Sequence, residues 1–302
     1  MSPSTTFPAS TGSEVRLSAR RNDCTSPTAG LAPGYLQANM IILPSRYAND
    51  FRSLCARNPV PCPLIGESSA VGRFDAVKSY ISSLSSPSSP TKNKSESVIQ
   101  TNDLDLRRDV GRYMVYQDAE PVKTGCLDIV EEWTSDHVAF LIGCSYSFET
   151  ALINAGLPPP HVLAKRNVAM YRTTIPLCPA GVFTGSTYVV SMRAYNRADL
   201  STVREITSKY HATHGEPIAW GWDALKKLGI KSIDIPDWGD SPVSQDGRPL
   251  ASLVGSETVI PVFWGCGVTP QEAVMRAGLK GVVMAHLPGH MLLLDCVDED
   301  IL

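Results

Sequence analysis

Two cysteines occupy the same position in two similar stretches of the chain, GCSYSFETALINAGL from Gly143 and GCGVTPQEAVMRAGL from Gly265. Each stretch follows an apolar run, HVAFLI or VIPVFW, so each is predicted to form a buried strand, a Gly-Cys turn and a helix. The N–H groups and dipole of a helix N-terminus attract anions and lower the pKa of a nearby thiol. We therefore expect the turns of Cys144 and Cys266 to face each other and to hold either both ends of a small dianion or one anion and a reacting centre.

Polar residues next to the two cysteines extend this prediction. Ser145 follows the first cysteine, and Gly267 and Thr269 follow the second. Thr269, with Glu272 three residues later, predicts an N-cap and a capping box at the second helix. The alternative is structural: a turn of small residues lets strand and helix pack closely, and an ancestral duplication explains the repeat without both copies being active.

Three residues are candidates for proton transfer: His214, Glu149 and His290. Imidazole and carboxylate groups are the usual general acids and bases. Each has a structural alternative, because a histidine in a turn is often a surface residue and a carboxylate in the first turn of a helix serves its dipole. His286 and His290 have the spacing of a helical metal pair, but Pro288-Gly289 between them breaks a helix. We expect neither a metal nor a cofactor.

Two arginines lie inside apolar segments, Arg172 in MYRTTIP and Arg193 in VVSMRA. A charge in such a position is costly unless it is paired. Each arginine is therefore either in a structural ion pair or a bidentate clamp for a carboxylate ligand. Gln37 and Asn39 follow a turn rich in Gly and Pro. They are either amide donors to a ligand or residues that cap the backbone.

The composition limits the classes of function. The net charge of -3 leaves no basic field for nucleic acid, and no apolar run is long enough to span a membrane. The eight cysteines contain no C-x-x-C pair, so a zinc ribbon is disfavoured and we expect free thiols in a reducing compartment. We predict a cytoplasmic enzyme for a small molecule, with the mitochondrial matrix as the alternative and homo-oligomerisation left open.

The order of the predicted elements indicates an α/β fold. We predict a three-layer α/β domain built on the duplicated strand, Gly-Cys turn and helix, with a smaller inserted two-layer α+β subdomain. The larger domain is discontinuous, 30–165 and 251–302, and the inserted subdomain covers 166–250. Strands followed by helices favour a parallel sheet. Residues 1–29 are predicted to be a disordered or targeting tail, and 67–101 a mobile low-complexity insertion.

Many segments together resemble one family, the D-glutamate cyclase-like proteins, many of which are described only as hydro-lyases by inference. The matching segments are GLAPGYLQANMIILP, DFRSLCARNPVPCPL, FLIGCSYSFETAL, NVAMYRTTIP, VVSMR, HGEPI, PVFWGCGVTPQ and HLPGHMLLLD. The resemblance implies a three-layer α/β domain with a smaller α+β domain. Two departures stand out: the Ser/Pro-rich run around Ser82–Ser97 is longer, and MRAYNRAD replaces a Pro-containing turn.

The resemblance also implies a reaction, the conversion of D-glutamate to 5-oxo-D-proline and water. That reaction needs a base for the amine, an acid for the leaving oxygen and donors for the oxyanion. Cys144 is interpreted as a positioning group, since a carboxylate is a poor acceptor for a thiolate. Two alternatives remain at this point: a dehydratase of another hydroxy acid, and a non-catalytic protein that binds a small carboxylate.

Overall fold

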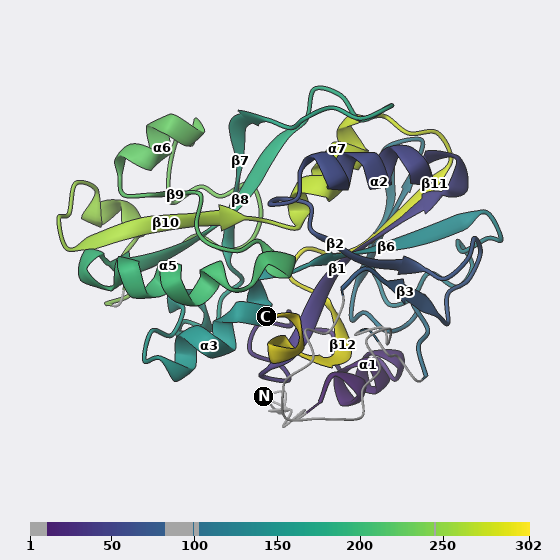
Figure 1. The fold of residues 1–302 in the computed structure, drawn as a ribbon, viewed down its shortest axis with the longest axis horizontal. Coiled ribbons are helices and arrows are strands. Elements are labelled where there is room, and N and C mark those ends of the chain that lie inside the picture. Colours follow the sequence, from purple (N-terminus) through teal and green to yellow (C-terminus); the bar gives the residue numbers. More distant parts are fainter. Residues whose placement is uncertain (1–10, 82–98, 100–102, 245) are drawn as a thin grey trace.

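The computed structural model describes residues 11–81, 99, 103–244 and 246–302, which form two antiparallel β-sheets with helices around them. Figure 1 shows the two sheets on opposite sides of the molecule, with the chain crossing between them near its centre. No helix in the described part is long and apolar enough to cross a membrane.

The larger sheet has the strand order β3-β2-β6-β1-β11-β4-β5, and β12 also pairs with β1. Its strands are β1 (Tyr35–Pro44), β2 (Leu64–Ser68), β3 (Val77–Ser79), β4 (Tyr113–Gln117), β5 (Glu120–Cys126), β6 (His137–Gly143), β11 (Val282–His286) and β12 (Leu292–Val297). β11 pairs with β1 at Ile41 and Ile42, whereas β12 pairs with β1 nearer its start. One edge of β1 is therefore shared, and the loop from β11 to β12 passes close to the middle of β1.

The smaller sheet has the order β7-β8-β10-β9. Its strands are β7 (Ala169–Pro176), β8 (Thr187–Asn196), β9 (Ala219–Trp220) and β10 (Val259–Gly265). The second apolar run, β10, thus belongs with the strands of the predicted subdomain 166–250. The domain boundaries themselves stay a prediction.

Seven α-helices pack around the sheets in the described part of the chain. They are α1 (Gly12–Arg20), α2 (Ala48–Arg57), α3 (Glu149–Asn154), α4 (Pro160–Leu163), α5 (Leu200–Ser208), α6 (Asp223–Leu228) and α7 (Val268–Arg276). In Figure 1, α5 and α6 lie on opposite sides of β10. Side chains of α6 pack with Phe263, and Val203 of α5 belongs to the same cluster as Trp264. Helices therefore cover both faces of the smaller sheet, which differs from the predicted two-layer unit.

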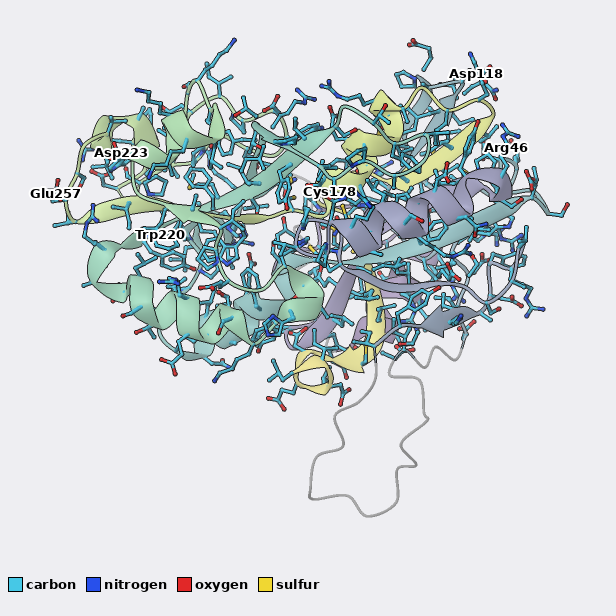
Figure 2. All side chains as sticks on the ribbon, turned by 45° about the horizontal axis from the view of Figure 1, so that its top comes forward. Arg46, Asp118, Cys178, Trp220, Asp223 and Glu257 are labelled. Atoms are coloured by element: carbon cyan, nitrogen blue, oxygen red, sulfur yellow. The ribbon has the colours of Figure 1, made fainter. Side chains whose placement is uncertain are left out.

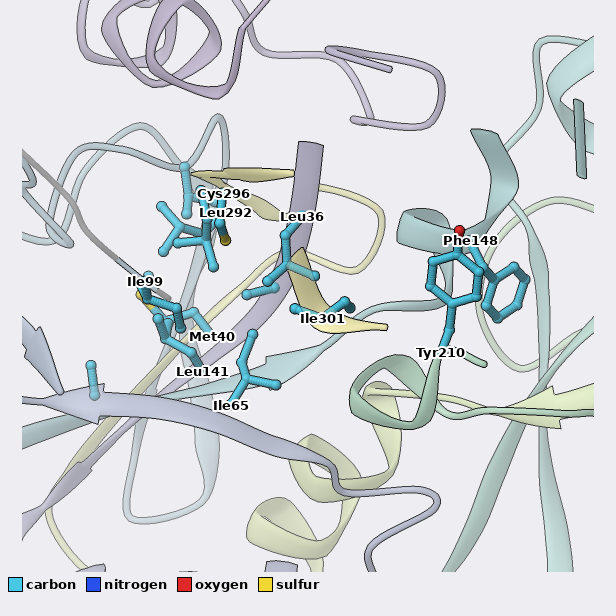
Figure 3. Packing of buried hydrophobic residues seen from close by; sticks show 14 of the residues in the cluster. Leu36, Met40, Ile65, Ile99, Leu141, Phe148, Tyr210, Leu292, Cys296 and Ile301 are labelled. Carbon is cyan, nitrogen blue, oxygen red and sulfur yellow. The ribbon is translucent and has the colours of Figure 1, made fainter. Parts of the chain in front are cut away.

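The side chains of the central strands are apolar on both faces of the sheet, so both faces must be covered. In β1, Met40 and Ile42 belong to one hydrophobic cluster, whereas Ile41 and Leu43 belong to another. Successive side chains of a strand point to opposite faces, so a continuous apolar run buries both. Figure 3 shows the first cluster, in which Leu36 and Met40 of β1 pack beside Leu141 of β6.

The expected parallel sheet is wrong, because every strand pairing in the described part is antiparallel. Each Gly-Cys turn is followed by a helix, but that helix does not lead back to a neighbouring parallel strand. After β6 and α3 the chain enters the other sheet at β7, and after β10 and α7 it returns to the larger sheet at β11. The duplicated unit therefore connects the two sheets instead of building one.

Two regions predicted to lack structure contribute regular elements. Residues 12–20 of the predicted tail form α1, which packs on β12. Within the predicted insertion, β2 ends at Ser68 and β3 pairs with it. Residues 1–10 and the Ser/Pro-rich run around Ser82–Ser97 lie outside the described residues. Disorder is wrong for residues 12–20, because Val15 and Arg16 of α1 are buried although Ser and Thr are frequent around them. The targeting alternative stays a prediction.

Arg16 fastens α1 to the sheet. Its guanidinium donates two hydrogen bonds to Asp295, at 2.9 and 2.8 Å, and one to the carbonyl of Leu293 at 2.9 Å. The side chain is only 1% exposed, whereas Arg21, just beyond the helix, forms an exposed pair with Asp23. A buried guanidinium is stable only with such partners.

We expect Arg16→Met to lower the free energy of unfolding by about 2 kcal/mol, because Asp295 would lose its partner at a partly buried site. The measurement is urea denaturation. Arg21→Met is the matched control, with an expected loss below about 0.5 kcal/mol because an exposed ion pair contributes little. Equal losses for the two variants would contradict a buried anchor.

Candidate active site

The two Gly-Cys turns meet at one cavity. Its lining includes Cys144, Ser145 and Tyr146 of the first turn and Cys266 and Gly267 of the second. The remaining lining residues come from four other segments: Asn39, Val168, Met170, Val268, Gly289 and Met291. The two Gly-Cys turns therefore face one cavity, as the sequence predicted. The free volume is about 10 Å³, roughly what one water molecule occupies, so a substrate must displace part of the wall to enter.

The helices after the two turns begin differently from the prediction. α7 begins at Val268 with Gly267 as its N-cap and no side-chain cap. The hydroxyl of Thr269 exchanges hydrogen bonds with the backbone of Val189 in β8, and Glu272 pairs with Arg172. The predicted capping box is therefore wrong, because both of its side chains have partners on neighbouring strands. Thr269 joins α7 to β8 and does not line the cavity.

The two thiols are not activated by the helix termini. Burial raises the pKa of Cys144 well above its ordinary value and the pKa of Cys266 to about 11. In each turn the N–H two residues after the cysteine, that of Tyr146 or Val268, offsets this rise only in part. The expected lowering is wrong because removal from water outweighs the helix dipole. Both groups are thiols at neutral pH, which agrees with a positioning role for Cys144.

Arg193 links the first turn to a buried carboxylate. Its Nε and Nη2 donate to Oε1 of Glu149 at 3.0 and 2.5 Å. Nη2 also donates to Oγ of Ser145 at 3.0 Å, and Nη1 donates to Ser191. Arg193 was predicted to form either a structural ion pair or a clamp for a ligand carboxylate, and these contacts are those of an internal ion pair. Because Ser145 accepts a hydrogen bond from Arg193, its own O–H is left to donate, and Ser145 lines the cavity.

Glu149 is an ionised carboxylate inside the protein. Burial disfavours its charge, but the attraction of His161 and Arg193 outweighs burial and holds the pKa of Glu149 below its ordinary value. Its second oxygen, Oε2, has no hydrogen-bond partner among the described residues. A buried acceptor with an unused oxygen is suited to take a proton from a substrate.

His161 completes this group and was not predicted from the sequence. Its Nε2 lies 3.2 Å from Oε1 of Glu149, and its ring stacks on Tyr146 at a centroid distance of 5.9 Å. The hydroxyl of Tyr146 donates to Oδ1 of Asn167 at 2.7 Å. The only local signal is the triple proline before His161, which starts α4 with Pro160 at its first turn and sets the histidine on a short helix facing Glu149.

His214 lies behind the glycines of both turns. Its Nδ1 donates to the carbonyl of Val60 at 2.8 Å, and a Cβ on Gly265 would lie 3.4 Å from that nitrogen. Nε2 has no hydrogen-bond partner among the described residues. Burial lowers the pKa of His214 to about 4, although the carbonyls of Val60 and Gly143 oppose the shift. The ring is therefore neutral at pH 7, with its lone pair on Nε2.

His286 shares the lowered pKa, also about 4 and also caused by burial. Between pH 6.5 and 4 the unfolded chain takes up protons that these two buried rings refuse, so stability falls as the pH falls through this window. We expect each ring to account for a loss of roughly 3 kcal/mol between pH 7 and pH 4. Urea denaturation of His214→Asn from pH 7 to pH 4 should give a flatter profile than the unchanged protein.

The control for this profile is His211→Asn, a substitution of an exposed histidine three residues before His214 in the same segment. A profile flattened equally by both substitutions would contradict burial of His214 as the cause. A profile unchanged by His214→Asn would contradict the lowered pKa itself.

Two amides predicted as donors lie on β1. Nδ2 of Asn39 lies 3.4 and 3.3 Å from the carbonyls of Ile142 and Gly143, and Asn39 lines the cavity. A Cβ on Gly267 would lie 1.9 Å from Nδ2 of Asn39, so only glycine fits there. Gln37 donates to the carbonyl of Thr28, and its Oε1 has no partner among the described residues. Gln37 does not line the cavity, and its role toward a ligand stays a prediction.

Other predicted residues lie outside the cavity. Arg172, like Arg193, forms ion pairs within the protein, because it donates hydrogen bonds to Glu272 and Asp237. Its side chain is 37% exposed. Both ring nitrogens of His290 face backbone carbonyls, those of Pro288 and Thr25. His286 contacts the carbonyl of Leu287. No group of three or more His, Cys, Asp or Glu residues in the described part is arranged to hold a metal.

An open cleft adjoins the enclosed cavity. Its volume is about 390 Å³, and it shares Val268 with the cavity. Asn167, the partner of Tyr146, also lines the cleft. Gly289 packs closely against Asn167, since a Cβ at this position would lie only 2.5 Å from Nδ2 of Asn167. Val268 is therefore part of the wall that separates the cleft from the cavity.

Comparison with known proteins decides the family. Residues 138–295, which contain both Gly-Cys turns, match the family described as D-glutamate cyclase. The chain belongs to the D-glutamate cyclase family. A protein of Schizosaccharomyces pombe named "Putative hydro-lyase" is 42% identical, over 93% of this chain and 83% of its own length. Proteins of the same description from Bordetella pertussis and Rubrobacter xylanophilus are 41% and 40% identical, over 96% and 95% of this chain and 91% and 96% of theirs.

Membership of the D-glutamate cyclase family, together with hydro-lyase relatives that match nearly the whole chain, makes this protein an enzyme of the carbon–oxygen lyase class. The family match includes every residue that lines the cavity except Asn39, and it also includes Glu149, His161 and Arg193. The resemblance inferred from the sequence is confirmed.

Proposed function

We propose that the chain is a hydro-lyase for a small carboxylate and that its reaction is the cyclisation of D-glutamate to 5-oxo-D-proline. In this reaction the amine nitrogen bonds to the γ-carboxyl carbon, and one oxygen of that carboxyl leaves as water. The ammonium group loses two protons, and both leave with that oxygen. The family and the hydro-lyase relatives support this reaction class.

The observation that carries the proposal is the chain of contacts from the cavity to the buried carboxylate. Ser145 lines the cavity, accepts from Arg193, and Arg193 is paired with Glu149. We assign the Ser145 O–H as a donor to the substrate carboxyl and to the oxyanion that develops from it. We assign Glu149 as the base that takes a proton from the amine, since it is ionised and its Oε2 is unused.

The second proton carrier is a histidine close to these groups. His161 contacts Glu149 and stacks on Tyr146, which lines the cavity. We assign it to the return of a proton to the leaving oxygen. His214 is the alternative base to Glu149, because its ring is neutral and its Nε2 carries no proton. Cys144, Cys266, Gly267 and Asn39 shape the cavity around the reacting carboxyl.

The test is proton NMR of the purified protein with D-glutamate, 5-oxo-D-proline and their L forms, with and without a chelator. Interconversion of the D pair alone, at a rate that the chelator leaves unchanged, is the expected result. Conversion of the L pair would contradict the stereochemistry. Failure to convert either pair, followed by water loss from a hydroxy acid in a wider screen, would keep the hydro-lyase class and overturn the substrate.

A further inference from the structure

We infer that the enclosed cavity is a binding site for one soft monovalent metal ion of the Cu(I) type. Its ligands are the sulfur atoms of Cys144 and Cys266, together with the thioethers of Met170 and Met291. The proposed reaction does not use such an ion, so the inference goes beyond the proposed function. A bound ion occupies the space that the substrate carboxyl must enter, and it therefore blocks the reaction.

Sulfur-containing side chains are concentrated around this cavity. The chain has eight cysteines and eight methionines among 302 residues, yet two of each are among the eleven residues that line the cavity. The same four belong to one cluster of eight buried residues in mutual contact. They come from four separate segments, the ends of β6 and β10, strand β7 and the loop before β12. The fold therefore gathers the four side chains at one point.

The size of the cavity suits an ion. Its volume of about 10 Å³ is roughly that of one water molecule. A substrate must displace part of the wall, whereas a single atom fits into the cavity as it stands. Each of the four sulfur-containing residues is at most 6% exposed. A bound ion is therefore shielded from water and from oxidants, which preserves the monovalent state of copper.

The types of donor select a soft ion. Thiolate and thioether ligands favour Cu(I), whereas Mg²⁺ and Ca²⁺ take oxygen ligands, and structural Zn²⁺ takes four groups from Cys, His and carboxylates. No His, Asp or Glu is among the described residues that line the cavity. Two cysteines alone do not complete a zinc site. The two methionine thioethers complete a site for Cu(I).

Binding exchanges two protons for the ion. Burial keeps Cys144 and Cys266 as thiols at neutral pH, so each S–H bond breaks as its sulfur binds copper, and both protons leave to solvent. One Cu⁺ on two thiolates has a single negative charge. The N–H groups of Tyr146 and Val268 favour the ionised form of the two cysteines, and they offset this charge.

The experiment is a competition for Cu(I) between the full chain and the coloured chelator bicinchoninate under anaerobic conditions. We expect the unchanged protein to take one ion from the chelator. Cys266→Ala should weaken this uptake by more than about 100-fold, since it removes a ligand and not merely a group that orients one. Met291→Leu keeps the volume but loses the thioether, so uptake should weaken by about tenfold.

Two cysteines outside the cavity provide matched controls. Cys178 is exposed and follows β7 (Figure 2), whereas Cys62 is buried in a different hydrophobic cluster. Cys178→Ala and Cys62→Ala should both take up the ion as the unchanged chain does. X-ray absorption at the copper edge of the loaded protein should show sulfur neighbours alone.

The outcomes decide the site independently of the proposed function. Unchanged uptake in either cavity variant, loss of uptake in either control, or nitrogen or oxygen neighbours of copper would overturn the four-sulfur site. Displacement of Cu(I) by an equal concentration of Zn²⁺ would do the same.

The effect on catalysis is a separate measurement. One equivalent of Cu(I) should abolish the cyclisation of D-glutamate by the unchanged protein, and full activity of the copper-loaded protein would overturn the block. If the metal-free protein converts no D-glutamate, the proposed function fails, and the uptake experiment still decides whether the cavity holds the ion.

Discussion

Replacement of Glu149 by Gln is expected to lower kcat for D-glutamate cyclisation by about 100-fold or more, the usual contribution of a general base. The amide keeps the shape of the carboxylate but cannot take a proton at Oε2, the oxygen that has no partner among the described residues. KM should change much less than kcat, because the substrate carboxyl is assigned to Ser145. Initial rates by proton NMR, with the folded fraction checked by circular dichroism, give both constants.

The control must remove a buried carboxylate without touching the cavity. Glu67 on β2 is 6% exposed and pairs with Arg52 at 2.7 Å, and it lines neither cavity nor cleft. Glu67→Gln should therefore leave kcat within about twofold, since neither Glu67 nor its partner Arg52 lines the cavity or the cleft. An equal fall of kcat in both variants would point to loss of structure. A normal kcat in Glu149→Gln would remove Glu149 from the mechanism and leave His214 as the base.

The sequence predicted the local elements of the site better than their surroundings. Apolar runs with flanking Gly and Cys identified β6, β10 and the helices after them, because periodicity and small-residue turns act over a few residues. Sheet membership is decided by contacts across the whole chain. β10 pairs with β8 and β9, and nothing within VIPVFW distinguishes this partner from the larger sheet.

Individual side chains were harder to place because their partners are distant in the sequence. The capping prediction for Thr269 followed a local rule, but Val189 in β8 offered the hydroxyl both a donor and an acceptor. The cost of an arginine in an apolar strand predicted that Arg193 needs a partner, yet not that Glu149, 44 residues earlier, supplies it. His161 gave no chemical signal, since only the fold brings it to Glu149.

The same reasoning predicts the largest loss of stability at Arg193. Its side chain is fully buried and pairs with Glu149, and its guanidinium lies over the rings of Phe148 and Trp264 at 5.2 and 5.3 Å. Arg193→Met should lower the free energy of unfolding by about 4 kcal/mol, because Glu149 would be left as a buried charge. Arg193→Lys keeps the charge but not the three-way set of donors, so a loss of about 2 kcal/mol is expected.

The double variant Arg193→Met with Glu149→Leu distinguishes a lost pair from lost packing. Removing both charges replaces a buried ion pair by apolar groups, which is often close to neutral. We expect the double variant to be more stable than Arg193→Met alone by about 2 kcal/mol in urea denaturation. A double variant that loses the sum of the two single effects would show that the two side chains act independently, and that the arginine is needed for its packing on Trp264. Recovery of stability without recovery of activity would instead show that the ion pair serves the chemistry of the cavity, since apolar side chains at the same two positions would give an equally stable protein.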